Sequence, residues 1–275
     1  MVDTITIVMN IRENYSQTIQ TIESLIKNTT LAYRFIFMDY KVPEFIKTYM
    51  NNQYKNIEII RTDNPYPSKA LHNIIPMLNT TYTVFLDNNI LFNPFWLEKL
   101  IECMKTTNAG IVGPVYVFNK NEIHMFGGDI TIINNNFMEN HYLLHQDKKI
   151  ISKLKPRKCS FVEYHCLMIR TDLLKQDVLD PSLLMIHEHI DLSLKVKRLG
   201  YDTYVTPYSV IEYVNNVELK SYEIDFFKER WNIEIAEKDI EYFCKKWGFN
   251  YNNSFDNVRN FVKTHIKKYI DIINV

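Results

Sequence analysis

The feature that most constrains the fold is an alternation of short apolar runs and amphipathic segments over residues 1–117. The apolar runs are rich in β-branched and aromatic residues, as strands are, and the intervening segments space their apolar residues three or four apart, as helices do. The expected strands are Thr4–Met9, Arg34–Met38, Ile57–Ile60, Tyr82–Leu86 and Ala109–Val117. The expected helices are Ser16–Ile26, Val42–Met50, Ser68–Leu78 with Ser68 as N-cap, and Trp96–Met104. This order predicts an α/β fold, with a mostly parallel sheet flanked by helices on both faces.

Beyond this region the pattern changes. A Gly127–Gly128 pair, a turn at residues 134–136 and polar loops rich in His and Tyr extend to Pro156, and we expect them to shape one side of a pocket. Regular structure should then return as a strand, a helix stopped by Gly200 and a strand closed by Pro207. These three elements are expected at Phe161–Arg170, Asp191–Leu199 and Tyr201–Thr206.

The last part of the chain, Ser221–Val275, has the pattern of helices, with Trp231 and Trp247 as packing anchors. A chain of 275 residues, 46% of them hydrophobic, is long enough for one large domain with an appendage. We therefore expect a main domain at residues 1–215 and a C-terminal helical extension packed on it at residues 216–275. The extension would also offer a surface for a homodimer.

Charge and cysteine content exclude several classes of function. Lys and Arg total 32, as do Asp and Glu, so the chain lacks the net positive charge that draws proteins to nucleic acid, and we expect no such partner. The four cysteines form no CxxC pair, which argues against a disulfide framework or a zinc knuckle. Residues 1–10 do not resemble a signal peptide, and no apolar run reaches the roughly 18 residues of a transmembrane helix, so we expect a cytoplasmic protein.

Three aspartates fall at or near the ends of expected strands, where parallel sheets bind ligands: Asp39, Asp63 and Asp87. At the last of them an apolar run stops abruptly in Asp-Asn-Asn, residues 87–89. A strand-end Asp followed two residues later by another oxygen ligand suits a hard divalent cation that bridges a diphosphate. Short polar side chains also cap turns, and that interpretation stays open for this triplet.

A second cluster places two carboxylates and two imidazoles within residues 187–191, just before an amphipathic helical pattern. Such a cluster can hold a general base. His189 suits the role by its unperturbed pKa of about 6.5, whereas Glu188 would need its pKa raised by its surroundings. Asp191 is the third candidate, or it caps the helix or orients the base.

Glu163 and His165 alternate along the expected strand Phe161–Arg170, so both side chains should point to one face. A buried strand does not tolerate two such groups without partners, so we expect them to face the site. A hydrogen-bonded pair in the core is the alternative.

Eight short motifs give the chain a specific resemblance. They are Arg12-Glu13, Asn28-Thr29, Phe37-Met38-Asp39, Phe85-Leu86-Asp87-Asn88-Asn89, Ile123-His124-Met125-Phe126-Gly127-Gly128, Glu163-Tyr164-His165-Cys166, Glu188-His189-Ile190-Asp191-Leu192 and Phe226-Phe227-Lys228-Glu229-Arg230-Trp231. In this order and spacing the chain resembles a family 2 glycosyltransferase of the GT-A fold, in a bacterial and giant-virus-like branch. The resemblance covers most of the chain.

The resemblance implies transfer of a sugar from a UDP-, GDP- or dTDP-sugar to a hydroxyl of a glycan or related acceptor. It places Asp39 near the base and Asp87 near the ribose or diphosphate. The same donor groove would be lined by Arg12, Lys69 and Asn73, although an exposed helical face explains Lys69 and Asn73 equally well. On the acceptor side we expect Glu163 and His165. Four further loop residues touch the acceptor or lie in a solvated loop: His124, His141, Tyr142 and His145.

The resemblance also implies a divalent ion, Mn²⁺ or Mg²⁺, held by Asp87 and Asn89. The sequence departs from the family pattern at Asn89, where a second Asp is usual, and an amide oxygen is a poorer ligand than a carboxylate. Tyr213 likewise stands where many relatives place a histidine. Both departures put metal dependence in doubt.

The reaction that this resemblance implies is an inverting transfer in one displacement, with a base from Glu188-His189. One alternative is a catalytically degenerate module that binds nucleotide sugars or glycans without turnover. Another, a nucleotidyltransferase, calls for a glycine-rich phosphate loop after the first strand, and residues 9–13 contain no glycine.

Overall fold

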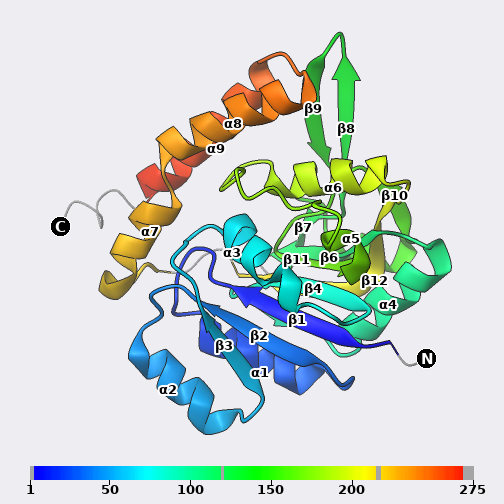
Figure 1. Cartoon of the computed structure of the whole chain (residues 1–275). Coiled ribbons are helices and arrows are strands. Elements are labelled where there is room, and N and C mark those ends of the chain that lie inside the picture. The colour runs from blue at the N-terminus through cyan, green and yellow to red at the C-terminus, as the bar shows by residue number, and fades with distance from the viewer. Residues whose placement is uncertain (1–2, 119–120, 215–217, 269–275) are drawn as a thin grey trace.

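The computed structural model describes residues 3–118, 121–214 and 218–268 (Figure 1). Its centre is a twisted sheet in the order β10-β12-β6-β11-β4-β1-β2-β3, with β5 paired to β12 and β7 paired to β6. Its strands are β1 (Ile5–Asn10), β2 (Arg34–Asp39), β3 (Ile57–Arg61), β4 (Tyr82–Asp87), β5 (Ile90–Phe92), β6 (Ile111–Phe118), β7 (Glu122–Met125), β10 (Arg157–Cys159), β11 (Cys166–Arg170) and β12 (Thr203–Tyr213). β1 to β4 are mutually parallel, as are β6 and β12, while β11 lies antiparallel between β4 and β6.

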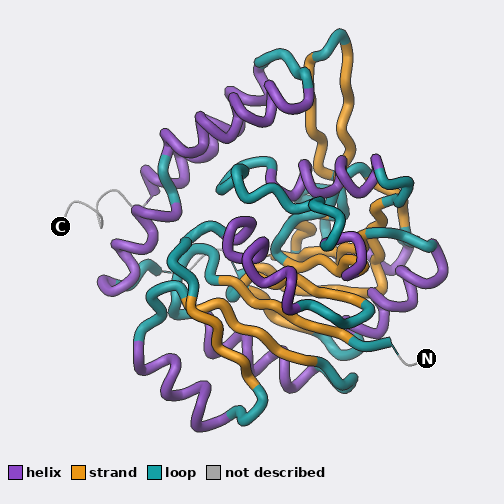
Figure 2. The backbone as a smooth tube through the Cα atoms, viewed as in Figure 1, coloured by secondary structure: helices purple, strands orange, loops and turns teal. Residues whose placement is uncertain are grey.

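Helices cover both faces of this sheet (Figures 1 and 2). The α-helices are α1 (Thr18–Asn28), α2 (Glu44–Gln53), α3 (Pro67–Ile74), α4 (Trp96–Thr107), α5 (Thr171–Leu174), α6 (Glu188–Arg198), α7 (Ile224–Arg230), α8 (Ile233–Trp247) and α9 (Asn253–Lys268). Short 3₁₀ turns lie at Ile75–Met77, Lys148–Lys153 and Ser221–Glu223. The mostly parallel, helix-flanked sheet that the alternation predicts is confirmed.

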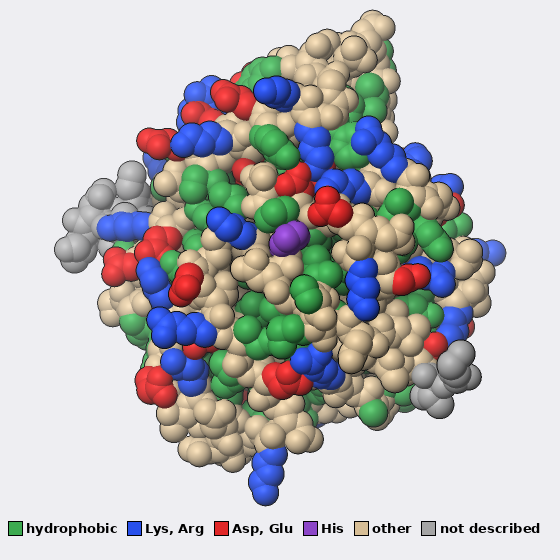
Figure 3. All heavy atoms as spheres, viewed as in Figure 1, with side chains coloured by type: hydrophobic (Ala, Val, Ile, Leu, Met, Phe, Trp, Pro, Cys, Tyr) green, Lys and Arg blue, Asp and Glu red, His purple; other side chains and the backbone are tan. Residues whose placement is uncertain are grey.

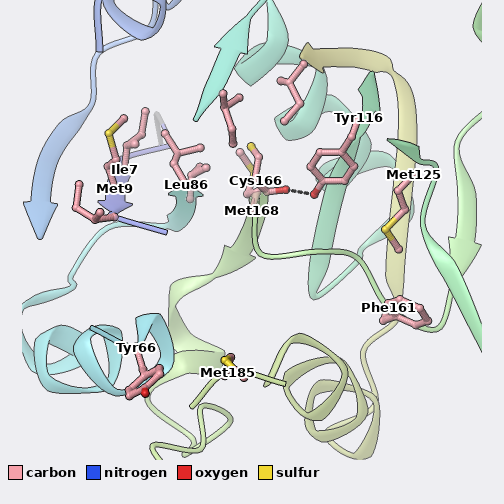
Figure 4. Packing of buried hydrophobic residues seen from close by; sticks show 14 of the residues in the cluster. Ile7, Met9, Tyr66, Leu86, Tyr116, Met125, Phe161, Cys166, Met168 and Met185 are labelled. Carbon is pink, nitrogen blue, oxygen red and sulfur yellow. Dashed lines mark hydrogen bonds between the residues drawn. The ribbon is translucent and has the colours of Figure 1, made fainter. Parts of the chain in front are cut away.

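Strand pleating sorts the core into two layers. On β1, Ile7 and Met9 pack with residues of α1, α2 and α4, whereas Val8 between them packs with residues of α3, α5 and α6. Figure 4 shows the first layer, where residues of successive strands lie side by side. The dashed line in that view marks the Tyr116 hydroxyl, which donates to the Cys166 carbonyl at 2.5 Å. The four cysteines are buried and free.

Three expected boundaries in the sheet and helices are wrong. Ser68 is not an N-cap, because α3 begins one residue earlier with Pro67, whose missing N–H suits the first helical position. β12 does not end at Pro207 but runs through it, since the ladder to β6 shifts register between Thr206 and Val210 and so needs no proline N–H there. Only Cys166–Arg170 of the expected strand from Phe161 is strand; residues 161–165 form an irregular approach with a turn.

The segment expected to be polar loops also contains strands. Besides β7, it forms a hairpin from β8 (Gly128–Ile133) and β9 (Asn136–His141), which make a separate two-stranded sheet. The turn between them consists of Asn134 and Asn135, with φ of 50° and 61°, as a two-residue hairpin turn with left-handed backbone requires. Figure 1 shows the hairpin projecting from the body.

The C-terminal helices connect this hairpin to the sheet. α8 and α9 run side by side and reach the hairpin at one end (Figure 1). At the other end, Glu229 of α7 accepts hydrogen bonds from Tyr40 and Tyr66, which precede α2 and α3. At the hairpin, the Asn250 N–H donates to the Asn135 carbonyl at 2.7 Å, and the Asn250 side chain donates to Asn134. Trp231 is buried and Trp247 is partly buried against the core. The boundary expected at residues 215–216 lies outside the described residues, as do residues 269–275, and no described helix is both long and apolar enough to span a bilayer.

Candidate active site

The carboxyl ends of β1 and β4 bring a buried cation and anion together. Asp87 ends β4 with 1% of its surface exposed, and its Oδ2 lies 3.4 Å from Nη1 of Arg12, which follows β1. His165 places its Nδ1 2.7 Å from the same oxygen. Burial raises the pKa of Asp87, but the Arg12 guanidinium and the His165 hydrogen bond outweigh it and hold the pKa below its usual value. Asp87 is therefore a carboxylate at neutral pH.

Asn88 fixes the loop that carries Arg12. Its Oδ1 accepts from the Arg12 backbone N–H at 3.0 Å, and its Nδ2 donates to the Asn14 carbonyl at 2.6 Å and to Thr18 Oγ1 at 3.0 Å. The sequence motif contains this residue without revealing its role. The only signal for it is a short amide side chain directly after a strand.

Asn89 is also buried, with 1% of its surface exposed, and neither atom of its side-chain amide has a hydrogen-bond partner among the described residues. A buried amide without hydrogen-bond partners destabilises the fold, so such a group usually binds a water molecule, an ion or a ligand. With Asp87 it could offer oxygens to a hard cation. Within the described ranges, however, no group of three or more His, Cys, Asp or Glu side chains is arranged to hold a metal. An ion here would depend on diphosphate oxygens to complete its coordination.

Glu188 lies in the first turn of α6, after His187, whose backbone is left-handed with φ of 62°. The Glu188 residue is 5% exposed, and its Oε2 has no hydrogen-bond partner among the described residues. Burial raises its pKa to about 8, against the opposing charges of Arg230 and Arg12. The carboxyl group therefore exchanges its proton near physiological pH.

His189 lies beside Glu188 in sequence and faces a different carboxylate. Its Nε2 is 3.7 Å from Oε1 of Glu163, and Nε2 of His141 is 4.0 Å from the same oxygen. Burial lowers the pKa of His189 to about 4, so its ring is neutral at pH 7. Glu163 and His165 do approach the site, although from an irregular segment rather than from alternating positions on a strand.

The C-terminal helix α8 holds the segment before α6 in place. Asp239 accepts from three successive backbone N–H groups, those of Leu184, Met185 and Ile186, at 3.1, 2.6 and 3.0 Å. Asp191 is tied to the same helix, since it accepts from Trp247 Nε1 at 2.8 Å and pairs with Lys246 at 2.6 Å. Sequence reasoning missed Asp239 and Lys246, because both look like ordinary polar positions of an amphipathic helix.

The ends of β2 and β3 form an open depression of about 450 Å³. It is lined by Asp39, Tyr40, Lys41, Lys47, Arg61, Thr62 and Asp63. Asp39 accepts from the Val42 N–H at 2.9 Å and lies 3.5 Å from Lys47 Nζ, so it shapes the loop as well as the depression. The depression is mixed in charge, as is the face of the molecule in Figure 3, where basic and acidic side chains are interspersed.

The remaining expected residues divide into two groups. His124 stacks on Tyr213 with ring centroids 5.0 Å apart and lies 5.6 Å from the His165 ring, so it borders the site. In contrast, His145 is exposed and pairs with Glu122, and the Tyr142 ring faces Arg157. Lys69 and Asn73 are exposed on α3 and form no hydrogen bond or ion pair with another described residue. The structure thus leaves these last two on an open helical face.

The two segments that the sequence singled out share one electrostatic environment. Burial lowers the pKa of Arg12, but the nearby carboxylates of Asp87 and Glu188 more than compensate and raise it. The charges of Asp87 and Glu188 thus act on the same guanidinium, which follows β1 at the carboxyl edge of the sheet, where α/β proteins bind their ligands.

Comparison with known proteins identifies the class. The chain is similar to a crystal structure of GalNAc-T7 with UDP, GalNAc and Mn²⁺, with a TM-score of 0.62 at 15% identity, over 79% of this chain and 44% of that one. This likeness shows the fold, which is that of a GT-A glycosyltransferase. The family described as "Glycosyl transferase family 2" matches residues 6–177, and the chain belongs to it. The chain spans less than half the length of the GalNAc-T7 chain that it matches. No curated protein sequence matches it.

Proposed function

We propose that the protein is an inverting glycosyltransferase in which Glu188 is the general base. Its carboxylate takes the proton of an acceptor hydroxyl while that oxygen forms a bond to the anomeric carbon of the donor. The bond from this carbon to the diphosphate breaks with its electron pair remaining on the diphosphate. A single displacement of this kind inverts the anomeric configuration.

The observation that carries the proposal is the buried Glu188 carboxyl, whose pKa is about 8 and whose Oε2 lacks a hydrogen-bond partner in the described chain. A base works best when its pKa lies near the working pH, because it must be both ionised and willing to accept a proton. His189, with a pKa of about 4, is a much weaker base. Asp191, held by Lys246 and Trp247, is better suited to position the helix start.

The donor would occupy the carboxyl edge of β1, β2 and β4. Asp39 and the depression beside it would take the base, and Arg12 with Asp87 would take the ribose and diphosphate, as the contacts between them support. His165 would act on Asp87, which it touches, and Glu163 would face the acceptor with His189. Lys69 and Asn73, exposed on α3, would contact only an outer part of the donor.

A divalent ion, Mn²⁺ or Mg²⁺, would be held by Asp87 and Asn89. When bound, it would neutralise charge that develops on the leaving diphosphate. The neighbouring GalNAc-T7 structure contains UDP, GalNAc and Mn²⁺, which makes UDP-sugars and Mn²⁺ the first conditions to examine. A glycan hydroxyl is the acceptor we propose.

Slow donor hydrolysis tests the proposal without a known acceptor. The pure protein is incubated with UDP-, GDP- and dTDP-sugars and Mn²⁺, and release of nucleoside diphosphate is measured from pH 6 to 9.5. One donor should be hydrolysed, with a rate that rises to a plateau above the Glu188 pKa of about 8. Glu188→Gln should lower that rate by about 10²- to 10⁴-fold, the usual contribution of a general base.

The matched control is Glu218→Gln, which removes an exposed carboxylate that pairs with Lys220. It should hydrolyse the donor as the wild type does. Donor binding without turnover by any variant would instead indicate a degenerate binding module. Unchanged hydrolysis in Glu188→Gln would show that Glu188 is not the general base and would favour His189 in that role.

A further inference from the structure

Arg230, the last residue of α7, is the most unusual charged residue of the fold. None of its surface is exposed, and it ranks with the largest fully buried side chains. Its three guanidinium nitrogens have no hydrogen-bond partner, and no carboxylate of the described chain forms an ion pair with it. Removing a guanidinium from water without such partners is strongly unfavourable. Since none of the described residues satisfies it, we ask which ligand could do so.

The surroundings of Arg230 locate it at the donor edge of the sheet. Its Cζ lies 5.7 Å from the centroid of the Tyr66 ring and 5.3 Å from that of Trp231. Tyr66 immediately precedes α3 and lines a small cavity with Asn10 at the end of β1. The cation therefore lies within the ring of strand ends that would take the donor.

The residues around Arg230 fix α7 to the same edge. The Glu229 carboxylate accepts from the Tyr40 hydroxyl and pairs with Lys41 at 2.7 Å, and its carbonyl accepts from the Tyr66 hydroxyl at 2.7 Å. Tyr40 and Lys41 belong to the depression that we assign to the nucleotide base. The position of Arg230 is thus set by contacts to both sides of the donor groove.

The charges that act on Arg230 are those of the proposed site. Burial lowers its pKa, Arg12 lowers it further by repulsion, and Glu188 and Asp87 oppose this. Arg12 lies 3.4 Å from Asp87 and 3.8 Å from Glu13, whereas Arg230 forms no ion pair with a carboxylate of the described residues, so its positive charge is in excess. Such an excess in a buried place suits a dianionic or trianionic ligand.

We infer that Arg230, together with Arg12, binds the diphosphate of the nucleotide donor, so that the C-terminal segment completes the donor site. This inference rests on the proposed function and names a residue of its site. A guanidinium donates two parallel hydrogen bonds to a phosphate, and a buried one needs no reorganisation as charge develops on the leaving group. The two cations belong to the protein itself, so part of the diphosphate affinity should remain in EDTA, and a divalent ion held by Asp87 and Asn89 would add to it.

The test measures binding of inorganic pyrophosphate, UDP and uridine by calorimetry in EDTA, for the full chain and three variants. Arg230→Met removes the charge at similar volume, Arg230→Lys keeps it, and Lys228→Met removes an exposed charge from the same helix. Wild type and Lys228→Met should bind pyrophosphate and UDP alike. Arg230→Met should bind both about 10- to 100-fold more weakly, with Arg230→Lys in between. Uridine affinity should be the same in all four proteins.

A second readout separates binding from folding. If Arg230 serves a ligand, ligand-free Arg230→Met should unfold at the same or a higher temperature than wild type, because an unpaired buried charge has been replaced by an apolar group. The inference is overturned if Arg230→Met binds pyrophosphate as wild type does, or if wild type binds it only with Mn²⁺. Pyrophosphate binding that depends on Arg230, without turnover of any donor, would contradict the proposed function and leave this inference standing.

Discussion

His165 and Asp87 form a buried pair, with Nδ1 of the histidine 2.7 Å from Oδ2 of the aspartate. The His165 ring is also stacked on Tyr213, with centroids 4.0 Å apart. The His165 carbonyl also accepts from the Asp87 N–H at 3.0 Å, so the segment of His165 holds the strand-end carboxylate in one orientation. Donor affinity and local stability should both depend on this hydrogen bond.

His165→Phe keeps the stacked ring and removes the hydrogen bond. We expect it to lower the free energy of unfolding by about 1–3 kcal/mol, the cost of leaving a buried polar group without a partner. Chemical denaturation measures this loss, with His72→Phe on α3 as a control that should change little. Equal stability of the two variants would mean that the bond contributes nothing to the fold.

Glu188 makes stability depend on pH in a direction that is unusual for an acid. Its pKa is raised from 4.5 to about 8 by burial, against Arg230 and Arg12 and with support from Asp239. The folded state therefore holds a proton that the unfolded state releases. This stabilisation is complete below pH 4.5 and is lost as pH rises through 8.

Glu188→Gln removes this dependence, because an amide does not ionise. At pH 8.5 the variant should have a higher free energy of unfolding than wild type, by an amount on the order of a few kcal/mol, and should unfold at a higher temperature. The difference should disappear near pH 5. Thermal unfolding followed by circular dichroism at the two pH values measures it, and a constant difference would contradict the raised pKa.

Asn89→Asp would place a second carboxylate beside Asp87 in the motif. Two carboxylates hold Mn²⁺ more strongly than one carboxylate and an amide. The melting temperature of the variant should therefore rise more on addition of Mn²⁺ than that of wild type, and EDTA should reverse the rise. The same measurement is repeated with Mg²⁺ as a second ion. Equal shifts of the melting temperature in both proteins would show that residue 89 is not a ligand.

Asp239→Asn would weaken the anchor of the segment that leads to Glu188. Hydrogen bonds to a charged group contribute about 1.5–3 kcal/mol, so the variant should be destabilised by about that amount. Its donor hydrolysis should slow while UDP affinity stays unchanged, since the donor groove is on other elements. Glu241→Gln, an exposed position of the same helix, is the control. A loss of UDP affinity in Asp239→Asn would show a wider disturbance.

Local pattern was sufficient for the central sheet and its helices, because β-branched runs and three-to-four spacing report burial directly. It failed where tertiary contacts decide. Pro207 stays within a strand because a register shift removes the need for its N–H. The strand Gly128–Ile133 is not predicted because its adjacent residues Ile132 and Ile133 are both exposed. Its sequence therefore lacks the alternation of apolar and polar residues that indicates a strand packed on a core.

For the site, the strand-end motif and the Glu188 cluster could be found from sequence, since each concentrates unusual side chains in a few positions. The motif at residues 226–231 contains Arg230 without revealing its role, and nothing in the sequence singles out Asp239. Each lies on an amphipathic helix where charged residues normally face water, and only the folded chain shows that both are buried. Sequence reveals which groups can react, but not which distant helix holds them in place.

The contacts of Asp239 and Lys246 bear on how a protein of this family can be re-engineered. Swapping tails between related transferases is an obvious route to altered specificity. In this chain the exchanged C-terminal helices include Asp239 and Lys246, which hold the segment before α6 and Asp191. A C-terminal segment from a relative therefore needs that relative's own sequence at residues 184–191. Residues 184–191 and the C-terminal helices should therefore be exchanged together.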